Sequence, residues 1–124
     1  MRRRHIRVLL ADDRPKVRSA LRLLLEHQPD IEILGEAVDT TGLLDWVRLV
    51  CPDLILLDWE LPGLPASALL PLLHYRRPGL RVIALSGRPE VRQTALAAGV
   101  DAFVSKGDPP EQLLKTLRAV GARG

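Results

Sequence analysis

Five short apolar segments recur along the chain, and a stretch with helical spacing follows each of them. Continuous apolar segments are typical of strands covered on both faces of a sheet, whereas alternating or short segments are typical of sheet edges. Residues 6–11, 54–57 and 82–85 are continuous, and we predict central strands there. Residues 31–34 and 102–104 are predicted to form the two edge strands.

The intervening stretches place apolar residues at helical intervals. They are predicted to form helices over residues 14–27, 41–50, 65–75, 89–98 and 110–120. In the first of them, Val17, Leu21 and Leu24 share one face, as a period of 3.6 residues requires. Pro71 lies inside the third, where the missing amide and the ring should kink or restart the helix.

Strands that alternate with helices indicate a parallel sheet with helices on both faces. Right-handed crossovers, together with the two edges named above, leave few topologies. We therefore predict an α/β fold of the flavodoxin-like, doubly wound (βα)5 type, with a five-stranded parallel sheet in the order 2-1-3-4-5. Proteins with this order bind ligands at the carboxyl ends of the strands, beside the switch between the first and third strands.

Composition narrows the class of protein. The 124 residues match a single domain spanning 1–124, and no apolar run reaches the ~20 residues of a membrane helix, so we expect a cytoplasmic protein without membrane contact. The lone cysteine, Cys51, excludes an internal disulfide and is expected to be a small buried side chain. A net charge of +3 with few aromatic residues is weak support for nucleic-acid binding, so we expect none by this chain, and the arginines at positions 2–4 are interpreted as a solvated tail.

Polar residues follow four of the predicted strands. Asp12 and Asp13 follow the first strand, Asp58 the third, Ser86 the fourth and Lys106 the fifth. Two carboxylates about 5 Å apart repel by roughly 3 kcal/mol at an effective dielectric constant near 20, so three of them require a compensating cation. Lys106 supplies one positive charge, and Mg²⁺, which prefers oxygen ligands, would supply more.

This set of residues suits phosphoryl transfer, which needs positioning and charge neutralisation. Asp58 would be the nucleophile that forms an acyl phosphate, and Ser86 would donate a hydrogen bond to a phosphoryl oxygen. Taken singly, each residue has an ordinary interpretation: Asp13 as a helix cap, Asp58 as a strand-end carboxylate, Ser86 in a turn, Lys106 in a solvated loop. These interpretations fail together, because independent loop residues need not all lie at one edge of the sheet.

Four segments in chain order carry a family resemblance. They are Val-Leu-Leu-Ala-Asp-Asp at 8–13, Leu-Ile-Leu-Leu-Asp-Trp-Glu-Leu-Pro-Gly at 54–63, Ala-Leu-Ser-Gly at 84–87 and Ala-Ala-Gly-Val-Asp-Ala-Phe-Val-Ser-Lys at 97–106. With them, the chain resembles the receiver domain of two-component response regulators from Arg7 to about Val120. Gly107, in place of the proline that follows the lysine in many members, resembles the branch whose receivers precede a LuxR-type helix-turn-helix output domain.

The resemblance implies a role for each site residue. Asp13, Asp58 and the backbone carbonyl of Glu60 would ligate Mg²⁺, and Asp12 would act through water. Asp58 would accept the phosphoryl group from a histidine kinase or a small phosphodonor.

Further roles follow from the same resemblance. Lys106 would pair with a phosphoryl oxygen, and Ser86 and Phe103 would form a switch pair in which the hydroxyl moves toward the phosphate and the ring turns inward. Independently of the resemblance, the fourth helix has a thin apolar face of Val91, Ala95 and Ala98, so we hypothesise that the face of the fourth helix, the fifth strand and the fifth helix is the switching and homodimer surface. Glu60 and Arg88 carry opposite charges at the site mouth and are expected to pair.

The function that these observations favour is a phosphoacceptor module and not an enzyme. It would be the N-terminal part of a DNA-binding transcriptional regulator, with no output domain in this chain. A single-domain response regulator is one alternative. A phosphatase-type enzyme with an aspartyl nucleophile is another, although its nucleophile usually lies in an Asp-x-Asp pattern after the first strand, where this chain has Asp12-Asp13.

Overall fold

The computed structural model describes residues 5–122 and contains, within them, a five-stranded sheet and five α-helices. The strands are β1 (Ile6–Ala11), β2 (Ile31–Ala37), β3 (Leu54–Asp58), β4 (Arg81–Ser86) and β5 (Ala102–Ser105). The helices are α1 (Pro15–Glu26), α2 (Thr40–Val50), α3 (Ala66–Arg76), α4 (Arg92–Ala98) and α5 (Pro110–Gly121). The predicted tail at positions 2–4 lies outside the described residues.

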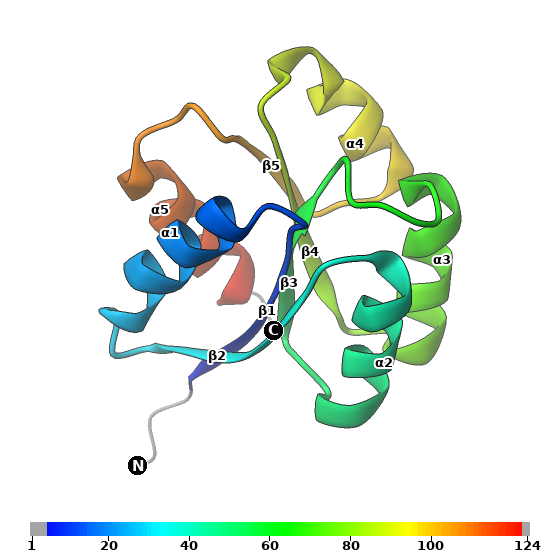
Figure 1. The fold of residues 1–124 in the computed structure, drawn as a ribbon, viewed down its shortest axis with the longest axis horizontal. Helices are drawn as coiled ribbons and strands as arrows, with labels where there is room; N and C mark the ends of the chain where they lie inside the picture. The colour runs from blue at the N-terminus through cyan, green and yellow to red at the C-terminus, as the bar shows by residue number, and fades with distance from the viewer. Residues whose placement is uncertain (1–4, 123–124) are drawn as a thin grey trace.

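The sheet is parallel throughout and has the order β2-β1-β3-β4-β5, which confirms the predicted topology and both predicted edges. Helices α1 and α5 lie on one face of the sheet, and α2, α3 and α4 lie on the other (Figure 1). Strand β3 is buried along its whole length, as the solidly apolar sequence of a central strand predicts.

Two apolar cores fill the space between the sheet and its helical layers. Successive side chains of a strand point to opposite faces, so Leu9 and Ile55 pack in the core under α2, α3 and α4. Leu10 and Leu56 pack in the other core, with residues of α1 and α5. Burying each such side chain contributes about 1.5–3 kcal/mol, so the central strands anchor both layers.

Strand β2 extends three residues beyond the predicted segment. Its pairing with β1 skips Leu34, which forms a bulge, and then continues through Gly35. A Cβ atom at Gly35 would lie 2.7 Å from the ring of Trp46, whose Nε1 donates to the carbonyl oxygen of Glu36 at 2.9 Å. A glycine inside a strand usually weakens it, whereas here Gly35 makes room for an indole.

Helix α3 runs without interruption through Pro71, so the predicted restart at that residue does not occur. The proline removes one intrahelical hydrogen bond. Leu69, Leu70 and Leu73 are buried around it, and this apolar contact holds the helix against the sheet. The predicted fourth helix, by contrast, divides into a 3₁₀ turn, η1 (Pro89–Val91), and α4.

Cys51 is exposed, so the prediction of a buried cysteine is wrong. The residue forms the C-cap of α2 in the left-handed conformation, with φ of 51°, and directs the chain into Pro52. The Arg7 guanidinium donates to the carbonyl oxygens of Val50 and Cys51, each at 3.0 Å. The Cys51 backbone therefore closes the helix while its side chain faces solvent.

The loop that follows β3 is held by a tight turn at Gly63, which has φ of 117°. A Cβ atom there would lie 2.1 Å from Thr40 Oγ1. That hydroxyl accepts from the amide of Leu64 at 2.9 Å, and the Thr40 amide donates to Pro62 at 3.0 Å. These contacts fix the path of the segment that carries Glu60.

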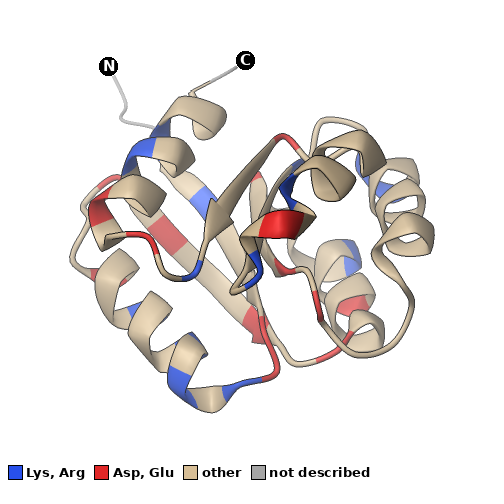
Figure 2. Ribbon diagram, turned by 90° about the horizontal axis from the view of Figure 1, so that it is seen from above, with Lys and Arg blue, Asp and Glu red and all other residues tan. Residues whose placement is uncertain are grey.

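No helix among residues 5–122 is both long and apolar enough to cross a membrane. Basic and acidic positions are interspersed on both sides of the sheet (Figure 2).

Candidate functional site

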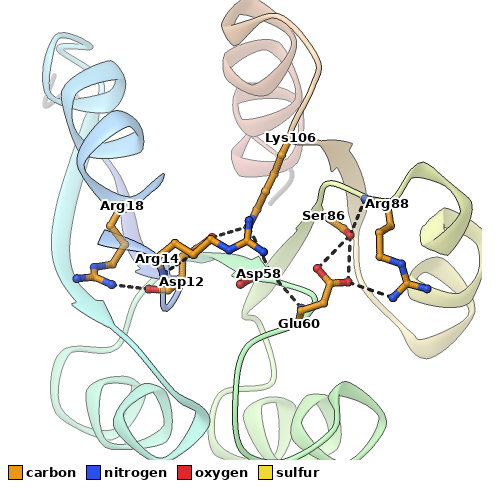
Figure 3. A network of polar contacts seen from close by, with 8 residues as sticks. All are labelled: Asp12, Arg14, Arg18, Asp58, Glu60, Ser86, Arg88 and Lys106. Carbon is orange, nitrogen blue, oxygen red and sulfur yellow. Dashed lines mark hydrogen bonds and ion pairs between the residues drawn. The ribbon is translucent and has the colours of Figure 1, made fainter. Parts of the chain in front are cut away.

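The carboxyl ends of the strands bring the predicted polar residues together at one edge of the sheet. Asp12 and Asp13 follow β1, Asp58 is the last residue of β3, and Ser86 is the last residue of β4. Lys106 follows β5 and reaches toward Asp12 and Asp58 (Figure 3). The predicted juxtaposition is confirmed, because parallel strands deliver all their carboxyl ends to the same edge.

Asp12 is completely buried, with 0% of its surface exposed. Its Oδ2 accepts from Lys106 Nζ at 2.7 Å, and its Oδ1 accepts from the Arg14 amide at 2.9 Å. Arg18 Nη1 donates to the Asp12 carbonyl oxygen at 2.8 Å. Asp12, and not Asp13, therefore organises the start of α1, whose N-cap residue is Arg14.

Asp58 is 3% exposed and lies beside two donors. The Glu60 amide donates to Asp58 Oδ1 at 3.0 Å, and Lys106 Nζ lies 3.4 Å from the same oxygen. Burial raises the pKa of the Asp58 carboxyl, and the Asp12 carboxylate adds to the rise, although the Glu60 amide and the Lys106 ammonium oppose it. The carboxylate is thus incompletely compensated by the protein itself.

Asp12, Asp13 and Asp58 form a cluster that could hold a metal ion. Each contributes a carboxylate oxygen, and these oxygens all lie within 4.8 Å of one another. Lys106 balances one of the three negative charges, and an exposed Asp13 leaves the cluster open to solvent. An all-oxygen, acidic and open donor set fits Mg²⁺, which retains several water ligands.

Ser86 and Glu60 are joined by side-chain hydrogen bonds. Ser86 Oγ lies 3.2 and 3.1 Å from the two carboxylate oxygens of Glu60 and accepts from the Arg88 amide at 3.0 Å. Arg88 Nη1 lies 3.9 Å from Glu60 Oε2, which confirms the predicted pairing of Glu60 with Arg88 (Figure 3). The bond from Ser86 to Glu60 was not expected from the sequence, because the two residues are 26 positions apart, one at the end of β4 and the other in the loop after β3.

Phe103, the other member of the predicted switch pair, is 5% exposed and packs in the core under α4. The Arg92 guanidinium lies 5.3 Å from the centroid of its ring, a cation–π contact. Helix α4 meets this core through Val91 at its start and through Ala95. The aromatic ring therefore already points inward in this structure, while the Ser86 hydroxyl points to Glu60.

A parallel five-stranded sheet with an acidic cluster, a hydroxyl and an ammonium at its carboxyl edge defines a phosphoacceptor signalling domain. Residues 8–118 match the family model described as the response regulator receiver domain, so the chain belongs to the response-regulator receiver family. The family consists of signalling proteins that take phosphate from histidine kinases and bind Mg²⁺ through acidic residues.

The relatives of the chain include DNA-binding regulators. It is 34% identical over 117 residues to the nitrate/nitrite response regulator protein NarL of Escherichia coli, covering 93% of this chain and 54% of that protein. A DNA-binding response regulator of the LuxR family from Staphylococcus aureus has a similar fold, with a TM-score of 0.83 and 25% identity over 94% of this chain and 98% of that one. The isolated receiver domain of RcsB from Salmonella enterica, solved with the phosphomimetic BeF₃⁻, gives a TM-score of 0.84 and 26% identity over 93% of this chain and 87% of that one.

The chain thus spans about half the length of the curated relatives that it matches, with 54% of NarL covered. The matching half is the receiver, and the similarity to NarL and to LuxR-family proteins agrees with the branch that Gly107 indicated.

Proposed function

We propose that this domain is phosphorylated on Asp58 by a histidine kinase and thereby switches an output surface. The observation that carries the proposal is the position of Asp58: a buried carboxylate at the end of β3, 3.4 Å from Lys106 and within a cluster of carboxylates. Attack by an Asp58 oxygen on phosphorus would form the acyl phosphate as the bond from phosphorus to the donor breaks.

The surrounding residues would each perform one task. Asp13, Asp58 and the Glu60 carbonyl would hold Mg²⁺ directly, and Asp12 would hold it through water. When bound, Mg²⁺ supplies positive charge that neutralises the phosphoryl oxygens. Lys106 would bind a phosphoryl oxygen, because its ammonium already lies between the Asp12 and Asp58 carboxylates.

Ser86 and Phe103 would pass the change to the rest of the domain. The Ser86 hydroxyl would turn to a phosphoryl oxygen, and the inward Phe103 ring would settle under α4. We propose that the face formed by α4, β5 and α5 then supports a homodimer.

We also propose that the domain is the N-terminal part of a DNA-binding transcriptional regulator. NarL-like and LuxR-family relatives support this proposal, since their names describe response regulators and DNA-binding proteins. A coding sequence that continues past residue 124 into a helix-turn-helix would support it, and a stop codon there would favour a single-domain regulator.

Incubation with acetyl phosphate and Mg²⁺ tests the central proposal. Intact mass spectrometry should detect a single phosphoryl adduct on the wild-type domain and none on Asp58→Asn, because the amide is not a nucleophile. Asp45→Asn, which removes an exposed carboxylate on α2, should form the wild-type adduct. An equal adduct on Asp58→Asn would contradict the assignment of Asp58.

A further inference from the structure

The Ser86 hydroxyl has one proton to donate, and in this structure it donates that proton to the Glu60 carboxylate. Ser86 is fully buried, and its Oγ lies 3.2 and 3.1 Å from the two carboxylate oxygens of Glu60. Carboxylates accept but do not donate, so Ser86 is the donor in this bond. Donation to Glu60 therefore excludes donation to a phosphoryl oxygen on Asp58 at the same time.

Neighbouring groups hold both partners in this arrangement. The Arg88 amide donates to Ser86 Oγ at 3.0 Å, which occupies an acceptor position and orients the hydroxyl. Arg88 Nη1 lies 3.9 Å from Glu60 Oε2 on the solvent side, and the guanidinium also pairs with Glu90 at 3.2 Å. The Glu60 side chain thus lies between a buried hydroxyl and an exposed arginine.

Glu60 also contacts the phosphoacceptor through its backbone, because its amide donates to Asp58 Oδ1 at 3.0 Å. A single residue therefore touches both Asp58 and Ser86, by different groups. A phosphoryl group on Asp58 would add negative charge near the Glu60 carboxylate. The resulting repulsion would weaken the bond between Glu60 and Ser86.

We infer that Glu60 is a positioning residue whose carboxylate competes with the phosphoryl group for the Ser86 hydroxyl. This inference rests on the proposed function, because it assumes that Ser86 donates to the phosphoryl group. In the unphosphorylated domain the competing bond keeps the hydroxyl away from Asp58, and phosphorylation must break that bond. Glu60 therefore lowers the affinity of the site for a phosphoryl group.

The strength of this competition sets the size of the expected effect. A hydrogen bond to a charged acceptor is roughly twice as strong as one to a neutral acceptor of the same shape. Glu60→Gln keeps the shape but removes the charge, so it should tighten binding of the phosphoryl mimic BeF₃⁻ about fivefold in the presence of Mg²⁺.

A double-mutant cycle separates this competition from simple charge repulsion. Dissociation constants for BeF₃⁻ with Mg²⁺ would be measured by calorimetry for wild type, Glu60→Gln, Ser86→Ala and the double variant, with melting temperatures to verify folding. Ser86→Thr retains the hydroxyl and provides a second background in which the competition should persist. Glu90→Gln is the matched control, since it removes a carboxylate that also pairs with Arg88 but takes no part in the bond between Ser86 and Glu60.

The competition predicts tighter binding on Glu60→Gln in the wild-type and Ser86→Thr backgrounds, and a change below about twofold in the Ser86→Ala background. Glu90→Gln should change binding less than about twofold. Equal tightening with and without the Ser86 hydroxyl, or no tightening at all, would overturn the inference and leave Asp58 phosphorylation standing. Failure of wild type to bind BeF₃⁻ would instead overturn the proposed function together with the inference.

Discussion

Lys106 serves two carboxylates, and it lies closer to Asp12 than to Asp58, at 2.7 against 3.4 Å. The shorter contact goes to the residue with no exposure at all, where an unpaired charge would cost the most. Asp58 has the longer contact with the Lys106 ammonium and one hydrogen bond from the Glu60 amide, and burial raises the pKa of its carboxyl. At the residue scale, the remaining charge around Asp13 and Asp58 is what would attract a divalent cation.

This charge balance predicts that Mg²⁺ stabilises the folded domain. A ligand that binds only the folded state at ten times its dissociation constant adds about 1.4 kcal/mol, which corresponds to roughly 4 °C in melting temperature. Asp13→Asn should abolish most of the shift, because it removes an exposed ligand without leaving a buried group unpaired. Thermal melts with Mg²⁺ and with EDTA measure the effect.

Asp45→Asn is the matched control for that substitution, since it removes an exposed carboxylate of equal charge on α2, outside the Asp12, Asp13 and Asp58 cluster. It should keep the full Mg²⁺ shift. An equal loss of the shift in both variants would mean that Mg²⁺ acts through general screening and not through the cluster.

At the element scale, charged contacts fix α1 onto the edge strand β2. Glu36 on β2 accepts from Arg18 at 3.0 Å and also pairs with Arg22, and both arginines extend from α1. The hydrogen bond from Arg22, opposed by partial burial and aided by Arg18, keeps the pKa of the Glu36 carboxyl below its ordinary value. This pair of arginines reinforces an interface that buries Leu25 of the helix.

A carboxyl whose pKa is lower in the folded than in the unfolded state stabilises the fold at pH values where it is ionised in both states. That contribution is present above the ordinary value of 4.5 and is lost as the pH falls through the folded pKa. Glu36→Gln should therefore lower the free energy of unfolding by about 1 kcal/mol at pH 7 and by less at pH 3. Urea denaturation at the two pH values measures this.

Glu32→Gln, at an exposed position of the same strand, provides the comparison. It should change the free energy of unfolding less than Glu36→Gln at pH 7. A Glu36→Gln loss that is the same at pH 3 and pH 7 would show that packing, and not ionisation, accounts for the effect.

At the scale of the whole molecule, α4 is a short helix that buries little apolar surface against the sheet. It contains seven residues, of which Ala95 is buried, and Val91 precedes it. Because an alanine buries little apolar surface, α4 is weakly anchored against the core that holds Phe103. Leu96 of α4 is 41% exposed and is therefore available to a dimer contact made by this helix.

Addition of BeF₃⁻ and Mg²⁺ should therefore increase self-association, because the phosphoryl mimic shifts α4 and β5 toward the form that pairs. Leu96→Arg should weaken that association about tenfold or more, since it introduces a charge into an apolar contact. Sedimentation velocity over a concentration series measures the equilibrium.

Leu49→Arg makes the same change at a leucine that is 70% exposed on α2, and α3 lies between α2 and α4 in Figure 1. It should leave the association unchanged. Equal loss in both variants, or no response to BeF₃⁻ in wild type, would contradict the α4–β5–α5 face as the dimer surface.

The sequence by itself determined the topology and the membership of the site. Continuous and alternating apolar segments distinguish central from edge strands because a strand covered on both faces cannot carry polar side chains at alternate positions. Strand direction then fixes which loops share an edge, so Asp12, Asp13, Asp58, Ser86 and Lys106 were predictable as one group.

Tertiary structure alone decided which partner each residue takes. Lys106 and Asp12 are 94 positions apart, and Ser86 and Glu60 are 26 apart, so their bonds depend on how separate loops fold toward each other. Gly35 in β2 and the exposed Cys51 were missed for the same reason: the first depends on the Trp46 ring packed over it, and the second on a left-handed helix end. Local pattern specifies where a side chain starts, but packing between distant segments specifies what it contacts.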